Sequence, residues 1–126
     1  MNHDLDALAD ALFRAFEAND TAAIEACCAP DARFSQNGSP SVPIARLLPS
    51  FASMRDRIGS HRYTEVARGL FADGFVEEHT VETVLPNGTP VRLRACVVAR
   101  VDDSGRVREL NEYLDPAPMR SASTPG

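Results

Sequence analysis

The last third of the chain reads as three β-strands joined by short turns, and this pattern restricts the fold most strongly. The segments 75–85 and 91–101 are rich in β-branched residues, and between them Asn87-Gly88 supplies the positive φ of a tight hairpin. A second turn with Gly105 at its tip leads into a third segment, 107–114. Parallel pairing of consecutive strands requires long crossover connections, so these strands are predicted to form an antiparallel meander.

The first half of the chain is predicted to be mainly helical, because apolar residues recur there at three- and four-residue spacing. The expected elements, in chain order, are a helix over 4–18, a short helix between Asp20 and Pro30, a strand over 31–35, a helix over 43–58 and a strand over 63–70. Pro49 should split or kink the third helix, because it removes a backbone donor and clashes with the preceding turn. Since helices are expected only before the meander, they can cover only one part of a bent sheet, which leaves a pocket.

Length and composition are typical of one small globular domain, which we expect over residues 1–117: the chain has 126 residues, of which 44% are hydrophobic and 25% charged. The tail 118–126 is rich in proline and serine and is expected to be disordered. No segment approaches the ~18 consecutive apolar residues of a membrane span, and the N-terminus lacks the basic start of a signal peptide, so we expect a cytoplasmic protein. The net charge of −5 argues against nucleic acid or a membrane as a partner.

Neither a metal nor an organic cofactor is expected from the sequence. The histidines are far apart, and none begins a ligand pair at helical or hairpin spacing: His3, His61 and His79. The chain has no glycine-rich phosphate loop and no nucleophile elbow. Cys27 and Cys28 are adjacent, which is poor geometry for a mutual disulfide, and Cys96 stands alone, so the cysteines are predicted to be reduced and structural.

Four short stretches carry a resemblance to a known superfamily. They are FRAFEAND (13–20), APDARF (29–34), LPNG (85–88) and NEYLD (111–115). With the order of elements from Leu5 to Asp115, they resemble the nuclear transport factor 2-like superfamily, which includes ketosteroid isomerases, limonene epoxide hydrolases and SnoaL-like polyketide cyclases. The resemblance implies an α+β, cystatin-like cone in which three N-terminal helices pack on a curved, mostly antiparallel sheet. It is specific for the fold and unspecific for the chemistry, because this fold hosts many functions.

The active site of ketosteroid isomerases is not preserved in this sequence. In that family a tyrosine on the first helix and an aspartate shortly after the first strand carry out the proton transfer. The resemblance places Leu12 and Gln36 near these two positions. Neither side chain can transfer the proton, so ordinary steroid isomerisation is not expected.

The active site of limonene epoxide hydrolases is not intact either. In that family an Asp-Arg-Asp set activates water and protonates the epoxide, and Glu112 fits the position of the late-strand acid. The arginine and its partner acid fall on Glu78 and Thr80, or, after a slip of one residue, on His79 and Val81. The chemistry therefore does not carry over from either family.

Glu112 and His79 remain as candidate catalytic residues. Glu112 alternates with Leu110 and Leu114, so its carboxylate would lie on an apolar strand face that raises its pKa and suits a general acid or base. Alternatively, Glu112 pairs with an arginine at the sheet edge. A neutral His79 could shuttle a proton or orient the substrate, but a lone strand histidine is commonly a surface residue or a satisfied core residue.

The sequence favours a SnoaL-like protein that handles a small, largely apolar molecule. The pocket is expected to be lined, besides Glu112, by Leu12, Phe16, Phe34, Leu48, Phe51, Met54, Tyr63, Leu110 and Leu114. An enzyme with this pocket would catalyse proton transfer next to a carbonyl, an aldol-type cyclisation or a hydration, with Glu112 as acid or base. A non-catalytic binding module and a structural dimerisation domain are the alternatives.

The chain is also expected to form a homodimer through its sheet face. That face would carry Arg92, Arg94 and Arg100 among apolar residues, and a two-fold dimer would bury it. Such a row of arginines is also typical of a solvated surface, on which glutamates of the neighbouring strand would be the natural partners.

Overall fold

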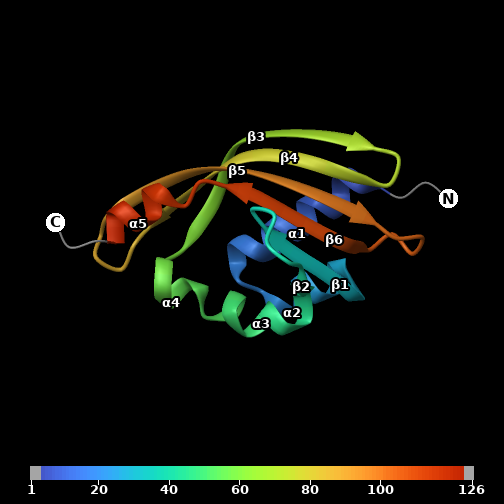
Figure 1. Cartoon of the computed structure of the whole chain (residues 1–126), viewed down its shortest axis with the longest axis horizontal. Helices are drawn as coiled ribbons and strands as arrows, with labels where there is room; N and C mark the ends of the chain where they lie inside the picture. The colour runs from blue at the N-terminus through green and yellow to red at the C-terminus, as the bar shows by residue number, and fades with distance from the viewer. Residues whose placement is uncertain (1–3, 124–126) are drawn as a thin grey trace.

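The computed structural model describes residues 4–123 and shows an α+β fold in which a curved sheet packs on helices (Figure 1). The helices are α1 (Leu5–Ala18), α2 (Thr21–Cys27), α3 (Ile44–Ala52), α4 (Met54–Ile58) and α5 (Ala117–Ser123). The strands are β1 (Cys28–Gln36), β2 (Val42–Pro43), β3 (His61–Phe71), β4 (Gly74–Val84), β5 (Pro90–Val101) and β6 (Val107–Leu114). In Figure 1 the long strands arch over α1 to α4, which lie on the concave side of the sheet.

The strands form one six-stranded sheet in the order β2-β1-β6-β5-β4-β3. The predicted meander of β4, β5 and β6 is confirmed, and its turns have positive φ at Gly88 and Gly105. Only β1 and β6 pair in parallel among the described strands, and this pairing sets Phe34 opposite Leu110 and Gln36 opposite Glu112. The concave face therefore combines residues from distant parts of the chain.

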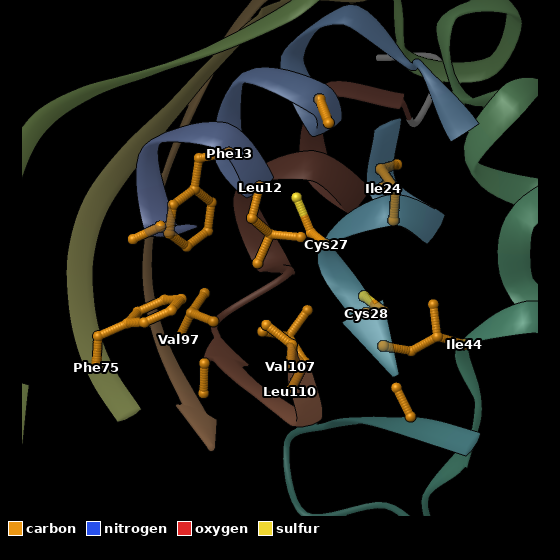
Figure 2. Packing of buried hydrophobic residues seen from close by; sticks show 14 of the residues in the cluster. Leu12, Phe13, Ile24, Cys27, Cys28, Ile44, Phe75, Val97, Val107 and Leu110 are labelled. Atoms are coloured by element: carbon orange, nitrogen blue, oxygen red, sulfur yellow. The ribbon is translucent and has the colours of Figure 1, made fainter. Parts of the chain in front are cut away.

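The first helix supplies much of the core. Asp4 caps its N-terminus by accepting a hydrogen bond from the Ala7 N–H at 2.9 Å, and Asn19 ends it in the left-handed conformation. Figure 2 shows Phe13 facing Phe75 of β4, whereas Leu12 points toward the cluster of buried side chains on β6. Among the described helices, none combines the length and apolar character needed to cross a bilayer.

A bulge in β3 changes which of its residues face the helices. Thr64 pairs with Thr80 and Ala67 with Glu78, so β3 contains one residue more than β4 between these pairs. Glu65, in the bulge, has a φ of 54°. Because the extra residue reverses the alternation, Tyr63 before the bulge and Arg68 after it both face the concave side.

The segment predicted as one helix over 43–58 is divided into α3 and α4, but the break lies at Ser53 and not at Pro49. Pro49 lies inside α3, and the chain leaves the helix only at Ser53, whose N–H donates to the Pro49 carbonyl at 3.1 Å. Pro49 and Ala45 are both exposed. Water can therefore reach the Ala45 carbonyl, which loses its helical donor, and the proline is tolerated within the helix.

The C-terminal segment is also different from the expectation of a disordered tail after the last strand. The helix α5 covers Ala117–Ser123, and its Met119 and Ala122 pack against a second cluster of buried residues on β4 and β5. The spacing of these two side chains places them on one helix face, and the Asp115 carboxylate accepts from the Ala117 N–H at 3.0 Å. Helices therefore lie both before and after the meander in the chain. Residues 124–126 of the expected tail lie outside the described part of the chain.

Candidate functional site

A cavity of about 250 Å³ lies between the concave face of the sheet and helices α1, α3 and α4. Most of its wall is apolar and aromatic, and its polar side chains are Gln36, Tyr63, His79 and Glu112. The remaining lining residues are Phe13, Phe16, Phe34, Leu47, Phe51, Met54, Val97 and Leu110. Edge-to-face contacts of Phe51 with Phe16 and Phe34, at 5.2 and 6.3 Å between ring centroids, hold the aromatic wall together.

Most residues that the sequence suggested for the pocket line this cavity, but three lie elsewhere. Leu12 is fully buried in the core beside the cavity, because the neighbouring Phe13 takes the position that faces it. Leu48 lines a separate hollow with Cys28 and Ile44. Leu114 lies near the end of β6, where it packs on the cluster covered by α5.

The sequence interpretation missed four lining residues: Phe13, Gln36, Leu47 and Val97. Leu47 could have been found, because it lies one helical turn before Phe51 on the same apolar stripe. Gln36 could not be placed from local patterns, since its position depends on the parallel pairing of β1 with β6. Val97 follows the alternation of β5, whose odd-numbered residues are buried from Val91 to Val101.

Glu112 presents a carboxyl group at the wall of the cavity. The parallel register places Gln36 beside it, and the Gln36 Nε2 donates a hydrogen bond to Glu112 Oε1 at 2.8 Å. Burial raises the pKa of Glu112 above its usual value, although the hydrogen bond from Gln36 and the nearby His79 oppose this shift. Among residues 4–123, the Glu112 side chain is hydrogen-bonded to the amide of Gln36 and forms no ion pair with an arginine.

His79 is held at the base of the cavity by a chain of charged side chains that runs from the buried Glu77 to the surface of α1. Its Nδ1 lies 2.6 Å from Glu77 Oε2, and both side chains are 1% exposed. Glu77 Oε1 accepts a hydrogen bond from Arg68 Nε at 2.8 Å and lies 2.7 Å from Arg68 Nη2 in an ion pair. Arg68 also donates to Asp6 and Asp10 of α1. Only the bulge in β3 brings Arg68 to this face, and sequence spacing did not indicate it.

The imidazole ring of His79 is fixed by aromatic neighbours. Tyr63 stacks on it with ring centroids 4.3 Å apart, and Phe13 contacts it edge-on at 5.2 Å. The backbone N–H of Tyr63 donates to Glu17 of α1 at 2.9 Å, which anchors the strand at this point. Burial raises the pKa of the Tyr63 phenol, with smaller contributions from Glu112, Glu17 and Glu77.

The arginines of β5 lie on the convex face, away from the cavity. Arg94 donates to Glu78 and Thr80, each at 2.9 Å, and Arg92 pairs with Glu65 and Glu82. Arg100 lies near Asp73 and Glu109. These cross-strand partners agree with a solvated row of charges. They also place Glu78 and Thr80 on the convex face, so His79 and Val81 point inward, as do Phe75 and Glu77 of the same strand.

No three histidine, cysteine, aspartate or glutamate side chains gather as possible metal ligands within residues 4–123. Cys27 and Cys28 are buried free thiols, and burial raises the pKa of Cys28 to about 12. These thiols therefore stay protonated near neutral pH and are poor nucleophiles.

A cone of helices and curved sheet around a mainly apolar cavity with a partly buried carboxyl group defines the class of this protein as a nuclear transport factor 2-like α+β domain. The family model described as the SnoaL-like domain matches residues 9–110. The chain belongs to the SnoaL-like domain family. No match is found among curated proteins.

Several solved structures share this fold over nearly their whole length. IdmH, a presumed polyketide cyclase from Streptomyces antibioticus, is 19% identical with a TM-score of 0.81, over 95% of this chain and 98% of that one. A presumed polyketide cyclase from Xanthomonas campestris pv. campestris is 20% identical with a TM-score of 0.82, over 95% and 96%. An epoxide hydrolase of M. tuberculosis, similar to limonene epoxide hydrolase, is 22% identical with a TM-score of 0.69, over 92% and 86%. At these identities the similarity concerns the fold.

Proposed function

We propose that this protein catalyses proton transfer on a small, largely apolar carbonyl compound, without a cofactor, and that Glu112 moves the proton. The reaction would be an isomerisation, an aldol-type cyclisation or a hydration. The observation that carries this proposal is a partly buried carboxyl group, held by Gln36, in the wall of a mainly apolar cavity. The names of the similar structures, which include cyclases and an epoxide hydrolase, agree with such chemistry.

The raised pKa of Glu112 supports a role in both directions of proton transfer. A carboxyl group whose pKa moves toward neutrality is a stronger base when ionised and is more often available as an acid. As a base it would take a proton from the carbon next to the carbonyl and leave an enolate. The protonated Glu112 would then return the proton to another carbon or to oxygen, which closes an isomerisation.

The size of the cavity limits the substrate. A cavity of roughly 150 Å³ holds benzene, and pockets for drug-sized molecules begin at about 300 Å³. The observed volume, about 250 Å³, therefore suits one ring with a short substituent, and a longer molecule would extend past the cavity.

Deuterium exchange at the α-carbons of small cyclic ketones, followed by proton NMR in D2O, tests this proposal. Glu112→Gln keeps the shape of the side chain and should lower the catalysed exchange rate by about 10²–10⁴, the usual contribution of general acid–base catalysis. Glu109→Gln is the matched control, because Glu109 lies on the same strand with its side chain beside Arg100 and Arg108. Equal exchange by wild type and Glu112→Gln would contradict the assignment.

A non-catalytic binding module is the second candidate. The hydrogen bond from Gln36 already occupies one oxygen of Glu112, as it would in a carboxyl group that serves only to orient a ligand. In that case ring compounds would bind in the cavity, and none of the small cyclic ketones would exchange its α-protons faster with the protein than in buffer alone.

A further inference from the structure

One nitrogen of His79 lacks a partner at the base of the cavity. His79 is 1% exposed, and its Nε2 has no hydrogen-bond partner among residues 4–123. The surrounding side chains are mainly aromatic and aliphatic, and the ring lines the cavity. A buried polar atom without a partner is unfavourable, and such atoms in native structures mark positions where a ligand or an ordered water completes the hydrogen bond.

The neighbours of His79 determine which kind of partner its Nε2 requires. Glu77 Oε1 accepts from Arg68 Nε at 2.8 Å and lies 2.7 Å from Arg68 Nη2, so this always-charged guanidinium pairs with Glu77 as a carboxylate. An ionised carboxylate can only accept hydrogen bonds. The Nδ1 of His79 must therefore donate to Glu77 Oε2, and in the neutral ring the Nε2 keeps its lone pair as an acceptor.

The protein keeps the ring in this orientation. Rotating the imidazole by 180° would replace Nδ1 with a carbon atom next to Glu77 and would break the 2.6 Å hydrogen bond. Tyr63 and Phe13 restrict the ring plane, and Asp6 and Asp10 hold the Arg68 guanidinium in place.

We infer that the cavity is selective for ring compounds that carry an enol or phenol hydroxyl group, which donates its hydrogen bond to the Nε2 of His79. Such a compound satisfies the unpartnered nitrogen, whereas a simple ketone of the same size leaves it unpaired. The inference relies on the proposed function only for the location of the site. His79 pairs across β4 and β5 with Ala95, and Glu112 pairs across β6 and β5 with Val97, so one small ligand can reach both residues.

Binding of three probe molecules tests the selectivity without any assay of catalysis. Phenol can donate a hydrogen bond, acetophenone can only accept one, and toluene does neither. In Glu77→Gln the amide oxygen still accepts from Arg68, so the amide nitrogen donates to Nδ1 and the ring switches to the Nε2–H form. The ratio of the acetophenone Kd to the phenol Kd, measured by NMR titration, should therefore be about tenfold higher in the wild type than in Glu77→Gln.

Controls separate this effect from a general loss of structure. Glu78→Gln changes the adjacent residue, whose side chain is on the convex face, and should leave the ratio unchanged. Toluene should bind wild type and Glu77→Gln equally well if the cavity keeps its shape. An unchanged acetophenone-to-phenol ratio in Glu77→Gln would overturn the inference.

Nitrogen-15 NMR of the wild-type protein gives a second test that requires no variant to fold. The expected spectrum of His79 shows a protonated Nδ1 and an unprotonated Nε2. A protonated Nε2 in the free protein near neutral pH would refute the inference even if the protein catalyses ketone exchange. Conversely, the expected selectivity without any exchange would refute the proposed function and leave this inference intact.

Discussion

Removing the Arg68 side chain should destabilise the fold far more than removing a surface arginine. Glu77 is 1% exposed, and Arg68 reaches it through one hydrogen bond and one ion-pair contact, so Arg68→Met would leave a buried carboxylate without its counter-charge. Breaking a buried ion pair in this way typically costs about 3–5 kcal/mol. Because the Arg68 side chain is 14% exposed and water can enter the vacated space, we expect the lower end, about 3 kcal/mol.

Urea unfolding followed by circular dichroism measures this change. With a typical slope of about 1–3 kcal/mol per M, a loss of about 3 kcal/mol lowers the midpoint by roughly 1–3 M. Arg92→Ala is the control, because its side chain is 61% exposed and its ion pairs should contribute less than about 1 kcal/mol. The double variant Arg68→Met/Glu77→Gln should recover part of the loss, since it removes the unpaired charge. If Arg68→Met is no more destabilising than Arg92→Ala, Glu77 is not the buried charge described above.

Three other predictions concern stability and assembly. Leu12→Ala should lower the free energy of unfolding by about 2–5 kcal/mol, because Leu12 is fully buried. Phe16→Ala only enlarges an existing cavity, so it should cost less than the ~3–5 kcal/mol of a core phenylalanine and less than Leu12→Ala. Urea titrations in which Phe16→Ala is the more destabilising variant would contradict the packing. The pKa of Glu112 is higher in the folded state than its ordinary value of 4.5, so protonated Glu112 favours the folded state. This contribution to the free energy of unfolding is complete below pH 4.5 and is lost as the pH rises through the folded-state pKa. Wild type should therefore lose stability relative to Glu112→Gln across that interval, and parallel pH profiles of unfolding would disagree. Light scattering at micromolar concentration should give a homodimer mass if the convex sheet face, with its exposed Tyr113, is an interface, and a monomer mass would exclude this.

Local patterns in the sequence predicted most elements of the fold, although not β2 or α5. The Asn87-Gly88 turn and the β-branched runs around it predicted the meander, and the apolar spacing of the first helix predicted α1 to within one residue of its start. These features depend on neighbours within one turn of chain, where backbone preferences and side-chain periodicity act directly. The same reasoning placed Glu112 on an apolar strand face, because alternation along a strand is a local property. It named His79 as a candidate without deciding which face of the strand 75–85 lines the pocket.

The tertiary structure alone decided how the site is assembled. Gln36 reaches Glu112 only because β1 pairs in parallel with β6, and Arg68 reaches Glu77 only because a bulge reverses the alternation of β3. Pairing register and bulges arise from contacts between segments far apart in the chain, and a shift of one residue moves a side chain to the opposite face. The sequence therefore determined which residues could carry chemistry, whereas strand pairing and the bulge in β3 decided which neighbours hold them in place.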